Sequence, residues 1–440
     1  MRSVKIRSET ADFYKMLDKY LQVIHNDYVS KENKAFYYRT AARYVEYLSA
    51  HFPCVLVQGA RQVGKSTLLE SVMPGGMNYV SLDDFVLAER ARRDPMGFLE
   101  DYAPPLCIDE VQYAPDLLRA IKIRVYKEKS SGMYWMTGSQ QLHVMKDVSE
   151  TLAGRVGIMD LHSLSQQESL GYGETARVFD PSAPEDCINE GSACSLETLY
   201  RRIWRGGYPA LVADTELDPD VFFESYVRSY LERDVNDLAQ VGNRAAFVRF
   251  MRSAAMRTGQ QLVYADLARD AEMTSNTIKV WVSILERTGI ISLLHPYATN
   301  SIKRLTKTPK LYFCDTGLCC WLAGWESPES LMKSPFAGAI LENWVYAQLL
   351  RSYNHNGKRP QMYYYREANG RAEMDFLLVR NGGIYPMEVK RSSTPRLEDL
   401  RHASQIPVGP YKLMPGIVFC TSQTYYPLGN GNCAVPVSML

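Results

Sequence analysis

A glycine-bounded loop between an apolar strand and a helix restricts the fold of this chain more than any other feature. The loop reads Gly59-Ala-Arg-Gln-Val-Gly-Lys65-Ser66 and directly follows the apolar run Cys54–Val57. Glycines let such a loop curl until its backbone N–H groups point at phosphate oxygens, and the N-terminus of the following helix adds a favourable dipole. The pattern in this setting predicts a phosphate-binding loop of the Walker A type.

The loop residues have distinct expected roles toward a nucleotide such as ATP. Lys65 neutralises charge on the β- and γ-phosphates, and Ser66 ligates Mg²⁺. The expected nucleotide-binding residues are Gly59, Ala60, Arg61, Gln62, Val63, Gly64, Lys65, Ser66 and Thr67, with Ser139 from a later strand end.

Short apolar runs alternate with helix-length stretches over residues 54–161, which is typical of βαβ units and a parallel sheet. We therefore expect an α/β fold with a P-loop NTPase core at 36–165. The expected strands are Cys54–Val57, Tyr79–Leu82, Pro105–Ile108, Met133–Met136 and Ile158–Leu161.

A second motif, Leu106-Cys-Ile-Asp109-Glu110, is an apolar strand that ends in two carboxylates and resembles Walker B. Asp109 is expected to hold the metal, and Glu110 to orient and deprotonate the attacking water. The alternative is an acidic strand end that faces solvent.

Three further residues are candidates for contacts with the γ-phosphate. Ser139, in Thr137-Gly-Ser139, takes a sensor position, although a simple βα turn explains it equally well. Arg155 and Arg233 are candidates for a charge-stabilising arginine finger, in cis or in trans, and surface ion pairs are the alternative.

Length, charge and cysteine content exclude several classes of protein. The 440 residues suffice for about three domains. The 50 basic and 49 acidic residues give a net charge of +1, so bulk charge cannot drive binding to nucleic acid or membrane. No stretch of 18 uncharged apolar residues and no leader-like N-terminus is present, and the nine cysteines include no Cys-x-x-Cys pair. We expect a soluble cytoplasmic protein with reduced thiols and no membrane partner.

Beyond the core, the pattern divides the chain into four more segments. Residues 1–35 are expected to form a helical appendage and 166–243 a helical lid on the sheet domain. Residues 244–325 read as three helices and a hairpin, which suggests a winged helix. A basic stretch with Lys303, Arg304, Lys307 and Lys310 is its expected wing, either for DNA phosphates or merely solvated in an adaptor domain.

The C-terminal segment, 335–440, carries a cluster of carboxylates and a lysine. If the strands around Asp375 and Glu388 pair, both carboxylates can share Mg²⁺ with Glu342, and Lys390 can position water. A buried ion-pair network is the alternative.

Several motifs together resemble a prokaryotic family of AAA-like ATPases with a C-terminal domain of unknown function. They include the two motifs above, Ser81-Leu-Asp-Asp84, Leu152-Ala-Gly-Arg155, Arg205-Gly-Gly-Tyr-Pro209, Asp315-Thr-Gly-Leu318 and Glu388-Val-Lys390. The resemblance implies a restriction-endonuclease-like α/β fold for residues 335–440, whose motif this chain departs from at Met374.

Three functions are consistent with these features. The first is a Mg²⁺-dependent ATPase that acts as a switch or remodeller, with nucleic acid as its target and a homo-oligomer as one possible state. The second is an ATP-gated DNA nuclease that uses the C-terminal domain. The third is a non-enzymatic, nucleotide-sensing DNA-binding regulator.

Overall fold

The computed structural model describes residues 37–138, 151–231, 243–299, 308–367 and 370–440. The expected appendage at 1–35 lies outside these ranges. Within them, no helix combines the length and the apolar character that crossing a bilayer requires.

The first domain contains a parallel sheet with the strand order β2-β3-β4-β1-β5. Its strands are β1 (Cys54–Gln58), β2 (Asn78–Ser81), β3 (Leu106–Asp109), β4 (Tyr134–Gly138) and β5 (Val156–Asp160). The five strands expected from the sequence are confirmed, with ends shifted by a residue or two. After β1 the chain forms β2 at the far edge of the sheet, and it later places β4 and β5 on the two sides of β1. The loop after β1 therefore lies at the topological switch point, which is where open α/β sheets bind ligands.

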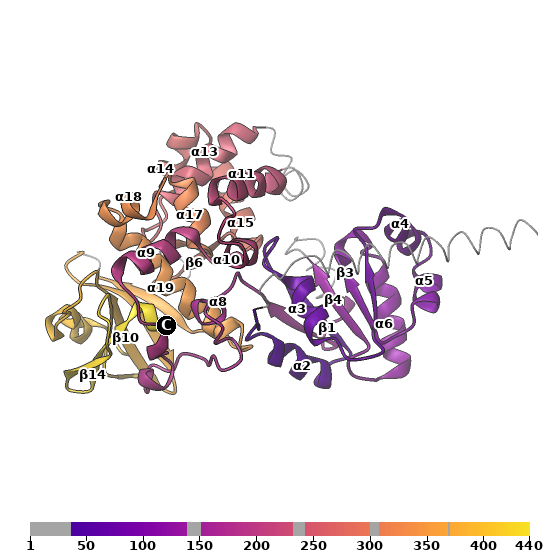
Figure 1. Cartoon of the computed structure of the whole chain (residues 1–440), viewed down its shortest axis with the longest axis horizontal. Helices are drawn as coiled ribbons and strands as arrows, with labels where there is room; N and C mark the ends of the chain where they lie inside the picture. The colour runs from indigo at the N-terminus through magenta and orange to yellow at the C-terminus, as the bar shows by residue number, and fades with distance from the viewer. Residues whose placement is uncertain (1–36, 139–150, 232–242, 300–307, 368–369) are drawn as a thin grey trace, which may run out of the picture. The chain divides into compact units, whose positions relative to one another are not determined.

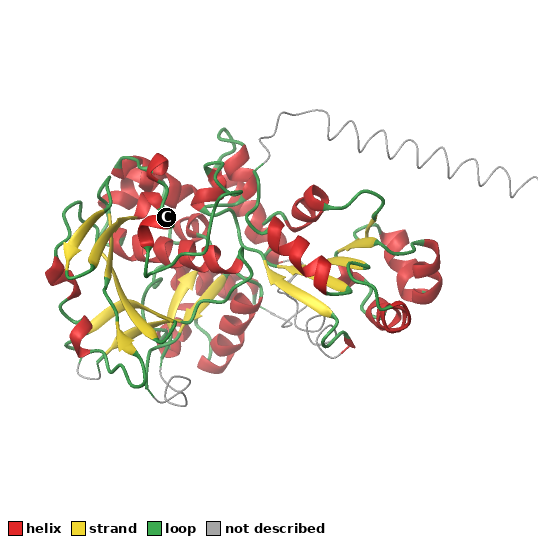
Figure 2. Cartoon of the chain, turned by 90° about the horizontal axis from the view of Figure 1, so that it is seen from below, coloured by secondary structure: helices red, strands yellow, loops and turns green. Residues whose placement is uncertain are grey.

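Helices cover both faces of this sheet (Figures 1 and 2). Val55 and Val57 share a core with α3, whereas Leu56 shares another core with α6, because alternate strand residues face opposite sides. The helices on the β1 Val55 face are α2 (Ala42–His51) and α3 (Lys65–Val72), and those on the other face are α4 (Phe85–Arg93), α5 (Pro95–Asp101) and α6 (Leu117–Glu128), with η1 (Val111–Tyr113) after β3.

A mainly helical region follows, and its first part is not the lid expected at 166–243. Helix α9 packs against α17 and α18, and α11 packs against α17, so these helices belong with later elements of the chain. The apolar face of α9, which includes Leu199 and Ile203, is buried there. The elements are α8 (Gln166–Ser169), η2 (Pro184–Asp186), η3 (Glu190–Ser192), α9 (Leu196–Arg205), α10 (Pro209–Ala213), α11 (Pro219–Tyr230), α17 (Thr316–Leu322) and α18 (Pro328–Lys333).

Three helices and an antiparallel hairpin occupy the stretch expected to form a winged helix. They are α13 (Arg244–Ala255), α14 (Tyr264–Ala271), α15 (Ser275–Arg287), β6 (Ile291–Leu294) and β7 (Lys310–Phe313). Thr274 caps α15 by accepting from the Thr277 N–H at 3.2 Å. Assignment as a winged helix stays a prediction. Of the expected wing residues, Lys303, Arg304 and Lys307 lie outside the described residues.

The C-terminal domain is a mixed sheet with a long helix. Strands β9 and β10 pair antiparallel with Phe376 opposite Met387, which brings Asp375 and Glu388 together as expected. The last strand of the chain, β14, has Ala434 and Val435 buried. The elements are α19 (Ala337–Asn354), β8 (Met362–Arg366), β9 (Glu373–Arg380), β10 (Gly383–Val389), η5 (Leu397–Leu400), η6 (Ala403–Gln405), β11 (Lys412–Leu413), β12 (Ile417–Cys420), β13 (Tyr426–Gly429), β14 (Asn432–Pro436) and η7 (Val437–Met439). A restriction-endonuclease-like fold stays a prediction.

Two glycine motifs, Arg205-Gly-Gly207 and Asp315-Thr-Gly317, pack closely against each other around Asp315. Its carboxylate caps α17 and also accepts from the Gly207 N–H at 2.9 Å. A Cβ at Gly206 would lie 2.2 Å from Asp315 Oδ1, and one at Gly317 would lie 2.5 Å from the Arg205 carbonyl oxygen. Only glycine permits this approach, which explains both motifs by packing.

Candidate nucleotide site

The loop after β1 has the backbone geometry that the sequence predicted. Gln62 and Gly64 have φ values of 59° and 89°, and α3 begins immediately afterwards at Lys65. A Cβ at Gly59 would lie 2.1 Å from the Leu161 carbonyl oxygen, so the loop begins where a side chain does not fit. The loop therefore places the N-terminus of α3 at the carboxyl edge of the sheet. Of the other expected nucleotide-binding residues, Ala60 and Val63 are buried, Gln62 and Thr67 are exposed, and Arg61 and Ser66 are half-buried.

Lys65 is held inside the loop. Its side chain is buried, and Nζ donates to the carbonyl oxygens of Ala60 at 2.9 Å and Gly59 at 3.2 Å. An ammonium held by neutral carbonyls can exchange them for phosphate oxygens, because an anionic acceptor adds Coulomb attraction to the hydrogen bond.

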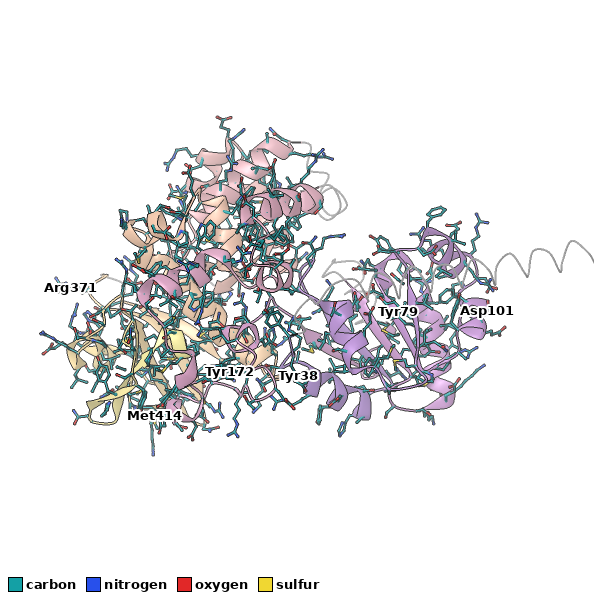
Figure 3. All side chains as sticks on the ribbon, viewed as in Figure 1. Tyr38, Tyr79, Asp101, Tyr172, Arg371 and Met414 are labelled. Carbon is teal, nitrogen blue, oxygen red and sulfur yellow. The ribbon has the colours of Figure 1, made fainter. Side chains whose placement is uncertain are left out.

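Asp109 is the centre of a hydroxyl cluster at the ends of β3, β4 and α3. Its Oδ1 accepts from Ser66 Oγ at 2.6 Å and from Thr137 Oγ1 at 2.5 Å, and its Oδ2 accepts from Ser81 Oγ at 3.4 Å. Tyr79 of β2, which is labelled in Figure 3, also interacts with Asp109; burial first, and the Asp109 charge second, raise the pKa of that phenol. Ser66 and Asp109 supply two oxygen donors of the kind that Mg²⁺ prefers, so the residues present fit that ion.

Glu110 follows in a left-handed conformation with φ 57°, which is uncommon for a residue other than glycine and aims its side chain away from the strand. Its N–H donates to Thr137 Oγ1 at 2.9 Å, and its carboxylate accepts from the Gln112 amide. The structure thus brings Ser66, Asp109, Glu110 and Thr137 together at one edge of the sheet.

The three candidates for γ-phosphate contacts have different outcomes. Ser139 and Arg233 lie outside the described residues. Arg155 is in the wrong place for a finger in its own chain, because Val156 pairs with Cys54 at the amino end of the strands, whereas the loop follows Gln58 at the other end. Strand rise alone separates those levels by about 16 Å, which is beyond the reach of one side chain.

A buried ion-pair network, which no sequence motif predicts, contacts the loop. Arg39 donates to the Val63 carbonyl oxygen at 2.7 Å, to the His162 carbonyl oxygen at 2.7 Å and to Glu168 Oε1 at 3.2 Å. Glu168 is fully buried; burial opposes its charge, but Arg39 and His355 overcome this and hold the pKa of that carboxyl well below its usual range. His355, at the end of α19, places Nδ1 3.2 Å from Glu168 Oε2. The network connects the loop to the C-terminal domain.

The C-terminal carboxylates are together, but a lysine lies among them. Lys310 from β7 is 3% exposed, and its Nζ lies 3.2 Å from Glu342, 3.0 Å from Glu373 and 3.9 Å from Asp375. The expected phosphate contact by Lys310 is therefore wrong. The expected metal site at Glu342, Asp375 and Glu388 stays a prediction: in the structure the Lys310 ammonium lies among these carboxylates, and the described residues hold no group of three or more His, Cys, Asp or Glu placed to hold a metal.

Lys390 completes this ion-pair cluster and does not stand free to activate water. Its Nζ donates to Glu388 Oε1 at 2.6 Å, while Asp375 Oδ2 accepts from the Val389 N–H at 2.9 Å. Burial raises the pKa of Glu342 and of Glu388, and the neighbouring Asp375 charge raises both further. The ion-pair network left open by the sequence describes this cluster best.

Three family models match successive segments of the chain. Residues 51–170 match a family model described as an AAA domain, and residues 196–329 and 337–440 match domains of unknown function, DUF8612 and DUF4143. The DUF8612 match extends across the domain boundary that we expected between residues 243 and 244. Helices α9 and α11, which precede that boundary, pack against α17, which follows it.

Relatives are found in bacteria and archaea. An uncharacterized protein of Mycobacterium tuberculosis is 28% identical over 88% of this chain and 81% of its own length, and one of Methanocaldococcus jannaschii is 22% identical over 72% of each. Among solved structures, a Walker-type ATPase of Pyrococcus abyssi has a TM-score of 0.41 at 14% identity, covering 66% of this chain and 97% of its own. RuvB of Thermotoga maritima has a TM-score of 0.25 at 14% identity, covering 57% and 85%. The chain thus matches an AAA-domain model near its N-terminal end and a DUF4143 model at residues 337–440.

Proposed function

We propose that this protein binds ATP together with Mg²⁺, hydrolyses it, and uses the cycle as a conformational switch. The observation that carries the proposal is the contact of Ser66 with Asp109, at 2.6 Å, beside Glu110 and Thr137. A hydroxyl, a carboxylate and a second carboxylate in that order are the parts that phosphoryl transfer to water requires.

Each residue has a role in that chemistry. The loop N–H groups and Lys65 bind the β- and γ-phosphates, and Ser66 and Asp109 hold the ion, which supplies charge neutralisation when bound. Glu110 accepts a proton from the attacking water, and Gln112 keeps that carboxylate in place. Arg233 remains our candidate for charge stabilisation.

The Arg39 network supports the switch. Phosphate binding reorganises the loop around Val63, and Arg39 is anchored both to Val63 and to Glu168. Because Glu168 also contacts His355 at the end of α19, a movement of the loop changes the environment of the C-terminal domain.

Phosphate release tests the enzymatic claim. We expect Glu110→Gln to lower turnover at least 100-fold while leaving ATP binding intact, because it removes the base and keeps the shape. Glu128→Gln, on the exposed end of α6, is the matched control and is expected to hydrolyse ATP like the wild type. Wild-type turnover by Glu110→Gln would refute this role and favour the non-enzymatic regulator.

Nucleic acid is the target that we propose, on narrower support. Lys279 and Arg287 are exposed on α15, which leaves two cations available to phosphates. Filter binding of duplex DNA between about 50 and 200 mM salt should show affinity that falls steeply with salt, whereas a flat response would exclude phosphate contacts. A nuclease has less support, because Lys310 and Lys390 pair with the carboxylates that cleavage would need.

A further inference from the structure

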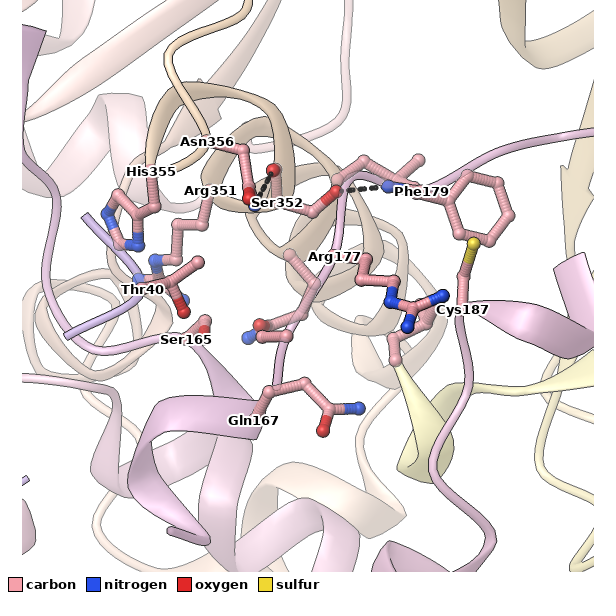
Figure 4. A pocket seen from close by; sticks show the side chains of 14 residues that line it. Thr40, Ser165, Gln167, Arg177, Phe179, Cys187, Arg351, Ser352, His355 and Asn356 are labelled. Atoms are coloured by element: carbon pink, nitrogen blue, oxygen red, sulfur yellow. Dashed lines mark hydrogen bonds between the residues drawn. The ribbon is translucent and has the colours of Figure 1, made fainter. Parts of the chain in front are cut away.

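A cavity of about 40 Å³ lies between the segment after β5 and helix α19 (Figure 4). Thr40, Ser165 and Gln167 form one wall, and Gln348 and Arg351 of α19 form another. By the usual volume of one water-sized sphere, the space holds about three waters or one small anion. No role in the nucleotide chemistry involves this cavity.

Two side chains of α19 bring unpaired donors to the cavity. Arg351 is 1% exposed; its Nη2 donates to Ser163 Oγ at 2.6 Å and to the Cys314 carbonyl oxygen at 2.7 Å, whereas its Nε and Nη1 have no partner. Gln348 is 4% exposed; its Oε1 accepts from the Gln166 N–H at 2.9 Å, and its Nε2 has no partner. A buried donor without an acceptor costs about 1–3 kcal/mol.

The charge around the cavity is positive at its margin. Asp315 lies 3.3 Å from Arg351 and balances that charge, and Glu168 balances Arg39. Burial lowers the pKa of His355, which also lines the cavity. Arg177 also lines the cavity, is exposed, and has no hydrogen bond or ion pair with any residue that the structure describes. Its guanidinium is therefore available to a ligand.

We propose that this cavity binds a small oxyanion, a phosphate or carboxylate group, held by Arg351, Gln348 and Arg177. The three unpaired atoms of Arg351 and Gln348 are all N–H donors, and an oxyanion only accepts. Water fits less well, because each water that accepts from these groups brings hydrogens that need acceptors of their own. The bound anion contacts the segment that also holds Glu168, next to the Arg39 network.

Equilibrium dialysis of the full chain against labelled inorganic phosphate tests the site. The nucleotide loop also attracts phosphate, so the Lys65→Ala variant is the background in which only the cavity should bind. We expect one phosphate per chain in that background. Adding Gln348→Glu should abolish binding, because the new carboxylate keeps the contact with the Gln166 N–H and repels the anion. Adding Arg177→Ala should weaken binding about tenfold, the effect of one charge-assisted contact.

Arg201→Ala, an exposed arginine of α9 outside the cavity, is the matched control and should leave binding unchanged. A parallel titration with acetate separates the two ligand chemistries: acetate without phosphate binding identifies a carboxylate ligand and supports the site. The proposal is overturned if neither anion binds in the Lys65→Ala background, if Arg177→Ala binds as tightly as its parent, or if crystals grown with phosphate and with acetate both show only water in the cavity. Because Arg177 is exposed, we expect Arg177→Ala to fold. This variant therefore tests the anion site even if Gln348→Glu fails to fold.

Discussion

At the scale of single residues, adjacent positions perform different tasks because the backbone changes direction between them. Asp109 ends β3 and binds three hydroxyls, whereas Glu110 turns into a left-handed conformation and points elsewhere. Asp109 and Glu110 were both readable from the sequence, since carboxylates after an apolar strand form a local pattern. The role of Arg39 could not be predicted from the sequence, because a lone arginine before a helix forms no recognisable motif. Its three partners are also separated from it in the chain.

Arg39 and Glu168 should be coupled in stability. Replacing Arg39 with Met leaves Glu168 buried without its main cation, so we expect a loss of about 3–5 kcal/mol in the free energy of unfolding. Adding Glu168→Gln should recover part of that loss, because the amide needs no counter-charge. Urea unfolding of the wild type, both single variants and the double variant measures the coupling. Losses that simply add would show that the two side chains act independently.

At the scale of elements, the positions of most strands could be predicted from the sequence, but the contacts that some of their side chains make could not. Alternating apolar runs identified β1 to β5, and the period of two placed Glu388 and Lys390 on one face. Lys310 was misassigned because it ends a basic run that looks solvated in sequence, yet β7 carries it into the acidic cluster of the C-terminal domain. Strand β14 was missed because it is short and follows a turn rich in glycine and asparagine.

Lys310→Met tests whether this lysine serves as the cation of the cluster. The cluster of Glu342, Glu373, Asp375 and Glu388 then loses the cation that contacts the first three of these carboxylates, and we expect a loss of about 3–5 kcal/mol in the free energy of unfolding. Millimolar Mn²⁺ should restore part of the stability of the variant and leave the wild type nearly unchanged. Lys122→Met, an exposed position on α6, is the control. Equal stabilisation of wild type and variant by Mn²⁺ would mean that a metal binds beside Lys310.

At the scale of the whole molecule, the segment after β5 connects the described domains. The carbonyl oxygen of His162 accepts from Arg39, the hydroxyl of Ser163 donates to Asp315, and the backbone of Gln166 contacts Gln348. One short segment thus touches the nucleotide loop network, the two glycine motifs around Asp315 and α19. No local sequence pattern indicates this role, because each of these partners is more than 100 residues away in the chain.

Hydrogen exchange should reveal transmission along this route. We expect Mg²⁺ and ATP to slow amide exchange in the nucleotide loop, in residues 161–165 and in the last turn of α19. In Glu168→Gln, protection should remain in the loop and decrease in α19, because the contact with His355 is weakened. An unchanged pattern of protection in this variant would exclude the route through Glu168.

Calorimetric titration of ATP with Mg²⁺ into the full chain tests the central claim most directly. The account predicts one ATP bound per chain by the wild type, and affinity weaker by about 100-fold or more in Lys65→Ala, which loses the ammonium that meets the β- and γ-phosphates. Absence of binding heat at several temperatures, or equal affinity in the two proteins, would contradict it.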